Sequence, residues 1–372
     1  MPQSPLLLTQ IPAEIVCAED YERWAERYLS PAAFAHLSEG SMADATLRAN
    51  RGAFERHTIY NRILVAGDYG STELLLCGQR FRHPFLLAPV AHQGLFHPDA
   101  ELASAQAANA LEAGLVLSTL SSTRLEDVAQ QTQAPRWFQL YFQTSKDATL
   151  NLVMRAEAAG YGAIVVTLDV SVHGVRRSSQ RLGFTLPAHL SAVNLKGIDG
   201  GPVRAINRDD STIFQGYMAD APTWDDLAWL LKSTTLPVLV KGVTHPDDAK
   251  RLQALGAAGI IVSTHGGRAL DGGMASLDAL PAIRQAVGPD FTLLLDSGVR
   301  SGIDAFKAIA LGANAVMIGR PYIYALATAG ALGVAHLLRI LRDELEITMA
   351  QAGCLHISDI GPHTLFNPSH LC

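Results

Sequence analysis

Eight short apolar runs alternate with longer amphipathic stretches from about residue 84 onward, and this alternation constrains the fold more than any other feature of the chain. Most of the runs follow or begin with Gly or Pro, and they are too short for helices, which is typical of parallel strands buried on both faces. The stretches between them, such as 98–113 and 301–313, have helical periodicity. The apolar runs are FLLAPV (85–90), LVLSTL (115–120), WFQLYF (137–142), AIVVTLD (163–169), PVLVK (237–241), GIIVS (259–263), TLLLD (292–296) and AVMIG (315–319).

Eight strand–helix units over roughly 250 residues predict an α/β fold, a (β/α)8 TIM barrel. A doubly wound sheet is the competing α/β fold, but the alternation is regular and no early GxGxxG is present. Residues 1–80 lack this alternation of strands and helices and are expected to form a helical extension packed on the barrel, residues 81–353. Residues 170–222, after the fourth strand, lack a convincing strand and are predicted to be a lid at the C-terminal face. Residues 354–372 are a C-terminal tail.

Composition limits the partners of this chain. Its net charge of −6 over 372 residues argues against non-specific binding to nucleic acid. No uninterrupted apolar run approaches the roughly 18 residues of a membrane span, and the start lacks the basic region of a signal peptide. The four cysteines show no CxxC spacing, so no disulfide framework or metal site is indicated. A cytoplasmic protein with no membrane partner is expected.

Polar and charged residues gather where the predicted strands end. In a barrel of this kind the active site lies at the C-terminal ends of the strands, so these side chains are expected to meet. Any one of them alone is better explained as a helix cap or a rim ion pair, but successive strands ending this way indicate a site. They are Gln139, Tyr141, Thr167, Asp169, Lys241, Ser263, His265, Arg268, Asp296, Arg300, Gly319 and Arg320.

The last two strand ends have the features of a phosphate site. LDSGVRSG (295–302) and IGRP (318–321) follow strands seven and eight, where such barrels commonly bind phosphate. Gly298 permits close approach of the backbone, and N–H groups at a helix start favour an anion. Arg300 and Arg320 can each bind phosphate oxygens through two hydrogen bonds. Lys241, on the same rim, suits a flavin that becomes anionic on reduction.

The turn STHGGR (263–268) carries the chemistry expected of a catalytic loop. Arg268 can bind a carboxylate through two parallel hydrogen bonds. His265, three residues earlier, can accept a proton from the same molecule, and Asp169 can orient the imidazole. The two glycines are expected to keep the turn narrow.

Together these motifs resemble the FMN-dependent L-α-hydroxy acid oxidase and dehydrogenase family, which includes glycolate oxidase, lactate oxidase and flavocytochrome b2. The resemblance runs from about residue 19 to 353, and STHGGRALD is similar to the family's active-site motif SNHGxRQxD. APVAHQG (88–94), RWFQLYF (136–142) and PVLVKGV (237–243) also fall in family order. KGVTHPDDA and LDSGVR look closer to lactate oxidase than to glycolate oxidase.

The resemblance implies a role for each site residue. His265 would be the base, paired with Asp169, and Tyr141 would bind the substrate hydroxyl. Arg268 and Arg176 would bind the substrate carboxylate. The residues implied to contact FMN are Ala88, Pro89, Val90, Ser118, Gln139, Thr167 and Lys241 near the ring, Ser263 and Asp296 near the polyol, and Gly298, Arg300, Gly319 and Arg320 at the phosphate.

The chain departs from the family pattern at four positions. His36 stands where the family has a tyrosine that helps bind the carboxylate, and its charge is expected to vary with pH. Leu120 replaces an aromatic residue over the substrate, which leaves room for a bulkier side chain. Together with His36 it puts glycolate, and also L-lactate, in doubt as the natural substrate. Thr264 and Ala269 replace the Asn and Gln of the motif.

The predicted function is FMN-dependent oxidation of an L-2-hydroxy acid to the 2-oxo acid, with O₂ reoxidising the flavin to give hydrogen peroxide. A dehydrogenase using a quinone or another acceptor is one alternative. A flavin- or phosphate-binding barrel isomerase and a non-catalytic flavoprotein are the others. The resemblance also implies a homotetramer or a higher assembly.

Overall fold

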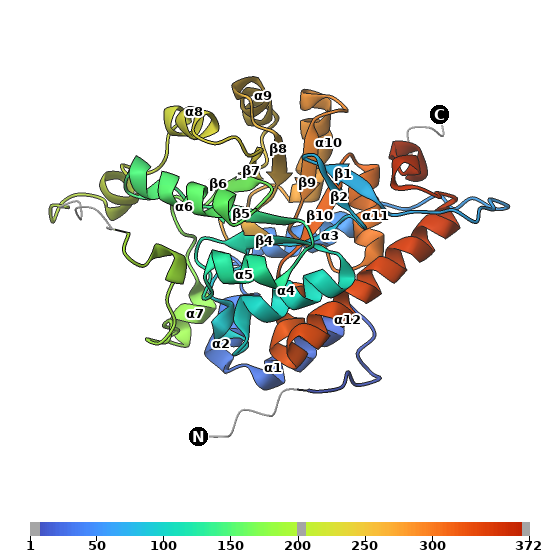
Figure 1. Cartoon of the computed structure of the whole chain (residues 1–372), viewed down its shortest axis with the longest axis horizontal. Helices are drawn as coiled ribbons and strands as arrows, with labels where there is room; N and C mark the ends of the chain where they lie inside the picture. The colour runs from blue at the N-terminus through green and yellow to red at the C-terminus, as the bar shows by residue number, and fades with distance from the viewer. Residues whose placement is uncertain (1–7, 199–205, 367–372) are drawn as a thin grey trace.

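The computed structural model describes residues 8–198 and 206–366 and has a closed barrel of parallel strands at its centre (Figure 1). The strand order is β10-β3-β4-β5-β6-β7-β8-β9, so each strand pairs with its neighbours in the chain and the last closes on the first. This confirms the predicted (β/α)8 barrel. The strands are β3 (Phe85–Leu87), β4 (Gly114–Ser118), β5 (Arg136–Leu140), β6 (Ile164–Thr167), β7 (Val238–Val243), β8 (Gly259–Val262), β9 (Thr292–Leu295) and β10 (Ala315–Ile318).

The strands are apolar throughout because both of their faces are buried. In β6, Val165 belongs to the cluster inside the barrel, while Ile164 and Val166 pack in the cluster between the strands and the surrounding helices. All three side chains are fully buried. Burying a side chain of this size contributes about 1.5–3 kcal/mol, so one short run stabilises two cores at once.

Helices surround the barrel and connect its strands. Several begin at residues that favour a helix start: Ser145 accepts a hydrogen bond from Ala148 N at α6, and Ser301 one from Asp304 N at α11. The helices after the first barrel strand are α4 (Ala100–Leu111), α5 (Leu125–Gln131), α6 (Lys146–Ala158), α7 (Arg177–Arg181), α8 (Trp224–Lys232), α9 (Pro246–Leu255), α10 (Ser276–Val287), α11 (Gly302–Ala310) and α12 (Arg320–Ala352).

Helix α12 is long and apolar enough to cross a membrane by length and composition, which sequence analysis did not detect. Two-thirds of the residues in its most apolar window are buried inside the protein. It packs along α1, α4 and α11, and its backbone is non-helical at Ala329 and Gly330. Packing within the fold therefore accounts for its apolar character.

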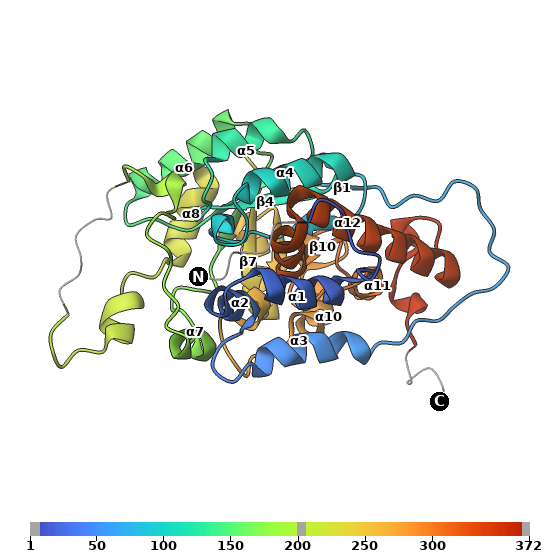
Figure 2. The same ribbon diagram turned by 90° about the horizontal axis from the view of Figure 1, so that it is seen from below.

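Three helices precede the barrel and lie across the structure in Figure 2: α1 (Ala18–Tyr28), α2 (Pro31–Ser38) and α3 (Ala45–Glu55). Residues 74–80 were expected to belong to this helical extension, but with Phe81 they form an antiparallel hairpin, β1 (Leu74–Leu76) and β2 (Gln79–Phe81). Its side chains close the N-terminal mouth of the barrel, where Phe81 packs edge-on against Trp137.

The segment after β6 is irregular, as expected, in the part that the structure describes. It contains α7, a single turn at Val193–Leu195 and a short π-helix at Thr212–Tyr217. Residues 199–205 of the predicted lid lie outside the described residues. The function of the segment as a lid stays a prediction.

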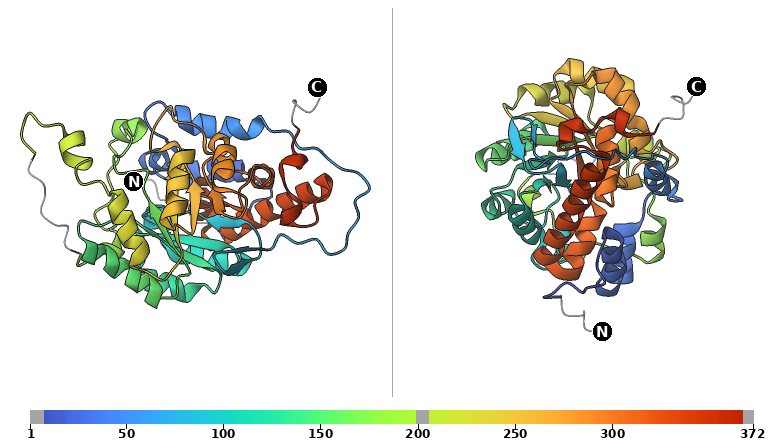
Figure 3. Two further views of the ribbon diagram at one scale, coloured as in Figure 1. Left: turned by 90° about the horizontal axis from the view of Figure 1, so that it is seen from above. Right: turned by 90° about the vertical axis from the view of Figure 1, so that its right-hand side faces the viewer.

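The segment between α3 and β1 extends away from the barrel beside the C-terminal end of α12 (Figure 3). The chain after α12 packs back on it through bridges between Ile59 and Leu365 and between Ser71 and His356. It forms two 3-10 turns, Ile357–Asp359 and Pro362–Thr364.

Candidate functional site

A cavity of about 430 Å³ lies at the C-terminal ends of the strands, within the usual range for small-molecule sites. Four of the predicted site residues do not line the cavity: Asp169, Gln139, Thr167 and Ser263. The predicted residues that line it are His36, Ala88, Pro89, Val90, Ser118, Leu120, Tyr141, Arg176, Lys241, His265, Arg268, Asp296, Gly298, Arg300, Gly319 and Arg320.

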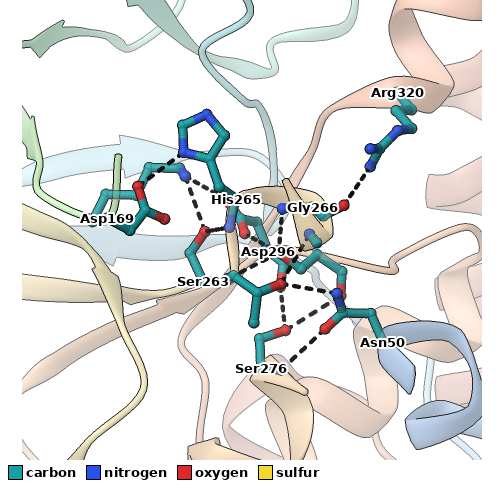
Figure 4. A network of polar contacts seen from close by, with 12 residues as sticks. Asn50, Asp169, Ser263, His265, Gly266, Ser276, Asp296 and Arg320 are labelled. Atoms are coloured by element: carbon teal, nitrogen blue, oxygen red, sulfur yellow. Dashed lines mark hydrogen bonds and ion pairs between the residues drawn. The ribbon is translucent and has the colours of Figure 1, made fainter. Parts of the chain in front are cut away.

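His265 and Asp169 form a pair at this cavity (Figure 4). The distance from His265 Nδ1 to Asp169 Oδ1 is 2.9 Å, and the carboxylate side chain is 8% exposed. Burial lowers the pKa of His265 below its ordinary value although Asp169 opposes this effect. Burial alone would raise the pKa of Asp169, but His265 and Lys241 hold it below its ordinary value. The pair is therefore a neutral imidazole held by a carboxylate, with Nε2 left to accept a proton.

A bulge in β7 makes room for the Asp169 carboxylate. The pairing of β7 with β8 shifts register between Lys241 and Val243, and Gly242 there has a φ of +103°. A Cβ at Gly242 would lie 2.4 Å from the Asp169 Cβ. Only glycine therefore lets β7 pass this close to the carboxylate.

Three successive residues of the catalytic turn have left-handed backbone: His265 (φ 55°), Gly266 (φ 66°) and Gly267 (φ 74°). A Cβ at Gly266 would lie 2.5 Å from Arg320 Nη1, and one at Gly267 would lie 2.6 Å from the backbone nitrogen of Leu47. The glycines therefore allow close approach of Arg320 and α3. This differs from the expectation that they simply narrow the turn.

Lys241 lies at the centre of the site beneath the cavity. Its Nζ donates to Ser263 Oγ at 2.9 Å and lies 3.3 Å from Asp296 Oδ2. Burial alone would lower the pKa of Lys241, but Asp296 and Asp169 raise it above its ordinary value. The ammonium therefore stays charged in a buried position.

Two buried polar groups beside it are left without partners. Gln139 Oε1 accepts from Thr119 N at 3.1 Å, but Gln139 Nε2 has no hydrogen-bond partner among the residues that the structure describes. Thr167 Oγ1 also has none within the described ranges, although both residues are at most 5% exposed. Buried polar groups are rarely left unpaired. Such donors beside a lysine suit the polar edge of a flavin ring.

Four guanidinium groups open into the cavity, and among residues 8–198 and 206–366 no carboxylate pairs with them as a salt bridge; they belong to Arg176, Arg268, Arg300 and Arg320. Burial lowers the pKa of each below its ordinary value, that of Arg268 well below it and that of Arg320 to about 10. The guanidinium group nevertheless carries its charge in proteins, because its ordinary pKa is so high. Buried charges are normally paired. This concentration of positive charge requires anionic ligands.

Backbone carbonyl groups in the last turn of α2 and just after it hold three of these arginines. Arg268 Nη1 donates to the carbonyl oxygens of His36 at 2.7 Å and Glu39 at 3.0 Å. Arg320 donates through Nη2 to Glu39 O at 2.8 Å, and Arg176 donates through Nη1 to Gly40 O at 2.9 Å. Carbonyl groups at a helix C-terminus lack intrahelical partners and attract cations.

Two backbone N–H groups at the first of the two predicted helix starts already have partners within the protein. Arg300 N, just before α11, donates to Asp304 Oδ2 at 2.8 Å, and Gly302 N, its first residue, donates to Glu344 Oε2 at 2.7 Å. The start of α12 has no side-chain cap at Gly319. A phosphate between Arg300 and Arg320 would therefore meet the N-terminus of α12.

The remaining residues of the cavity wall include two that were predicted to contact the substrate, Tyr141 and His36. Burial raises the pKa of Tyr141 to about 12, so its hydroxyl stays a donor. His36 stacks on Phe184 with ring centroids 4.1 Å apart, and burial with the charges of Arg268 and Arg176 lowers its pKa to about 3. Its imidazole is therefore neutral at physiological pH in the ligand-free protein, contrary to the expected pH-dependent charge.

Sequence analysis missed two histidines of this wall, His92 and His173. His92 has a φ of 51° and donates its backbone N–H to Leu120 O at 2.9 Å. Its buried Nδ1 finds no partner among the described residues. The motifs APVAHQG and VTLDVSVHGVRR contain both histidines. Both histidines lie shortly after a predicted strand, and this position is the signal by which sequence analysis could have found them.

The barrel, the His–Asp pair and the anion-binding arginines define an enzyme that holds a phosphate-bearing cofactor beside a carboxylate substrate. The FMN-dependent dehydrogenase family matches residues 25–367. The chain is 53% identical over 356 residues to an L-lactate oxidase of Alicycliphilus denitrificans, covering 96% of this chain and 98% of the relative. It is 38% identical over 348 residues to glycolate oxidase 1 of Zea mays, covering 93% and 94%.

Among solved structures, mandelate oxidase with (S)-2-phenylpropionate matches with a TM-score of 0.85 and 39% identity, covering 94% of this chain and 98% of the other. The chain belongs to the FMN-dependent dehydrogenase family. The comparisons confirm FMN as the cofactor and FMN-dependent oxidation of a 2-hydroxy acid with O₂ as the activity. They favour this function over the dehydrogenase, isomerase and non-catalytic alternatives.

Proposed function

We propose that this chain oxidises L-lactate, and L-2-hydroxy acids with slightly longer aliphatic side chains, to the 2-oxo acid. The observation that carries the proposal is a group of four guanidiniums in one cavity with the His265–Asp169 pair, for which residues 8–198 and 206–366 supply no carboxylate in a salt bridge. The cavity needs two separate anions, a phosphate and a carboxylate. A 2-hydroxy acid beside FMN supplies both.

Two groups of residues would hold different parts of FMN, its phosphate and its ring. Arg300 and Arg320, with the start of α12, would hold the FMN phosphate, while Lys241 and Gln139 Nε2 would face its ring. When bound, FMN accepts two electrons from the substrate and passes them to O₂. The fit rests on donors for which the described part of the chain supplies no partner.

The substrate side of the cavity orients the acid for proton removal. Arg268 and Arg176 would bind its carboxylate, and Tyr141 would donate to its 2-hydroxyl. His265 Nε2 would take a proton, either from C2 or from the hydroxyl, while Asp169 stabilises the resulting imidazolium. Both routes use the same base, and either leaves Asp169 ionised.

The side chain of the acid would face an aliphatic wall. Leu120 and Val170 line the cavity and supply no aromatic ring there. Relatives that are 53% and 43% identical carry the name L-lactate oxidase. These observations favour a methyl or short alkyl group over the hydrogen of glycolate.

The test is a series of L-2-hydroxy acids from glycolate through lactate and 2-hydroxybutyrate to mandelate, with O₂ consumption and hydrogen peroxide both measured. We expect the highest kcat/KM for L-lactate or 2-hydroxybutyrate and one peroxide for each O₂ consumed. A preference for mandelate would contradict the substrate proposal. Oxidation with a dye acceptor but without peroxide would contradict the oxidase proposal.

The assembly and the cellular location are further proposals. We infer a homotetramer or a higher assembly, supported by the family to which the chain belongs. Light scattering of the purified protein tests it, and a monomer at micromolar concentration would contradict it. A cytoplasmic location stays a prediction from composition.

A further inference from the structure

Glu39 is a buried carboxylate between the end of α2 and the start of α7, outside the residues assigned to the reaction above. It is 6% exposed. Its Oε2 accepts hydrogen bonds from Ser178 N at 2.9 Å and Ser179 N at 3.1 Å, and its Oε1 accepts one from Ser179 Oγ. The carboxylate is thus fully occupied by a single short segment of the chain.

Those two N–H groups belong to the first turn of α7 (Arg177–Arg181) and have no partner within the helix. The residue at the N-cap of α7 is Arg176, whose side chain does not cap the helix. Glu39 supplies that cap from another element. Arg176 therefore has two roles: it stands at the N-cap position of the helix that Glu39 caps, and its guanidinium lines the cavity.

The hydrogen bonds next to Glu39 join the same two segments. Arg176 Nη1 donates to Gly40 O at 2.9 Å, and Met42 N donates to Val175 O at 2.8 Å. A Cβ at Gly174 would lie 2.4 Å from Ser41 Oγ, so the segments are in close contact. Residues 39–42 thus form one surface on which residues 174–179 are fixed.

We propose that Glu39 is a positioning residue for the substrate carboxylate: by capping α7 it fixes the direction in which Arg176 enters the cavity. Arg176 lies at the start of the irregular segment after β6, which has no barrel strand to hold it. Without Glu39, the first turn of α7 loses three hydrogen bonds to α2. A displaced guanidinium loses part of its charge-assisted hydrogen bonding and is expected to bind its anion up to about 100-fold less well.

Glu39 also lies among positive charges. Its carboxylate opposes the fall in the pKa of Arg176 that burial causes, and it acts in the same direction on Arg268. Its backbone carbonyl accepts from Arg268 and Arg320. Replacing the side chain leaves that carbonyl in place, so a substitution keeps the hydrogen bonds that hold Arg268 and Arg320 while it removes those to α7.

The inference rests on the proposed function, because it assigns Arg176 to the substrate carboxylate. The probe is oxalate, which presents a carboxylate but has no hydrogen to lose, titrated against the flavin absorbance of the holoenzyme. In Glu39→Ala we expect the oxalate Kd and the KM for L-lactate to rise about 10- to 100-fold, with FMN retained and kcat within about threefold of the parent enzyme.

A double-mutant cycle separates positioning from a general loss of structure. If Glu39 acts through Arg176, adding Glu39→Ala to Arg176→Ala raises the oxalate Kd no further. A further rise in the oxalate Kd when Glu39→Ala is added to Arg176→Ala would overturn the proposal. So would an oxalate Kd in Glu39→Ala equal to that of the parent enzyme. Should Glu39→Ala fail to fold, Ser179→Ala, which removes one of the three hydrogen bonds, must show a smaller rise with the same dependence on Arg176.

The matched control is Asp359→Ala. Asp359 also accepts two backbone hydrogen bonds, from Leu355 N at 2.9 Å and His356 N at 2.8 Å, but it lies after α12 and does not line the cavity. We expect its oxalate Kd to match the parent enzyme. A parent enzyme whose flavin responds to neither oxalate nor L-lactate would reject the proposed function itself, a different result from a normal parent with an unaffected Glu39→Ala.

Discussion

Replacing Asp169 with asparagine tests how the carboxylate supports the base. Asparagine can still accept the hydrogen bond that joins Asp169 Oδ1 and His265 Nδ1 at 2.9 Å, so the imidazole keeps its orientation while the negative charge is lost. Two opposite charges 4 Å apart attract by about 4 kcal/mol at an effective dielectric constant of 20. Most of this attraction exists only once His265 has taken its proton.

We therefore expect the transition state to lose about 3 kcal/mol, which corresponds to a flavin reduction rate lowered about 100-fold. Substrate binding should change little because the arginines are untouched. The pH profile should shift as well. Neutral His265 is the active form, and its pKa lies below the ordinary value because burial outweighs Asp169. Removing Asp169 lowers that pKa further, so the acid limb of kcat/KM moves to lower pH.

The assay is anaerobic stopped-flow reduction of the bound flavin by L-lactate between pH 4 and 9. The matched control is Asp247→Asn, because Asp247 also lies near a histidine, with 3.9 Å between His245 Nδ1 and the carboxylate, but on the exposed surface. A reduction rate in Asp169→Asn within about threefold of the parent enzyme would refute the electrostatic reasoning. A slow variant whose acid limb moves to higher pH would refute the assigned sign.

The other predictions concern the anion sites and the catalytic turn. Arg268→Lys should raise the KM for L-lactate about 10- to 100-fold, because an ammonium cannot make two parallel hydrogen bonds; an unchanged KM would contradict the carboxylate assignment. Gly267→Ala should lower the free energy of unfolding by about 2–4 kcal/mol, since it adds a clash with Leu47 to a strained φ. Gly272→Ala, with a φ of 77° and open space around it, should cost only about 1 kcal/mol in the same urea titration; equal losses would show that close approach is unimportant. Riboflavin, which lacks the phosphate, should bind the apoprotein about 1000-fold more weakly than FMN, as the loss of about 4 kcal/mol of charge-assisted hydrogen bonds implies; equal affinities would contradict the phosphate site.

The barrel was predictable because its strands are buried on both faces. A run such as AIVVTLD has to be apolar at every position, so it stands out in the sequence without any knowledge of its partners. The site followed from the barrel, since polar residues at strand ends meet at one face whatever the loops do. His265 and Asp169 come together for this reason, although 96 positions separate them.

The parts that sequence analysis missed depend on contacts distant in the chain. The hairpin β1–β2 has strands of three residues each, and its place is set by Phe81 against Trp137. The start of α11 looked open to an anion, yet Glu344 from α12 occupies one of its N–H groups. The second carboxylate there, Asp304, forms a capping box with Ser301, a contact within one turn of the chain that sequence analysis did not use.

The position of Glu39 could not be inferred from its neighbours. In the sequence it is one acidic residue after α2, and nothing marks it as the partner of Ser178 and Ser179, about 140 positions later. The low pKa of His36 has a similar origin, because it comes from burial and from the charges of Arg268 and Arg176. Such effects require the packed structure.

The most direct test of the central claim is an anaerobic titration of the FMN-loaded enzyme with L-lactate and, separately, with D-lactate. The account predicts that one equivalent of L-lactate fully bleaches the flavin absorbance and yields one equivalent of pyruvate, while D-lactate leaves the spectrum unchanged. In His265→Ala the flavin should remain bound and oxidised under the same conditions. Normal bleaching in His265→Ala, or no bleaching of the parent enzyme by any L-2-hydroxy acid, would contradict the account.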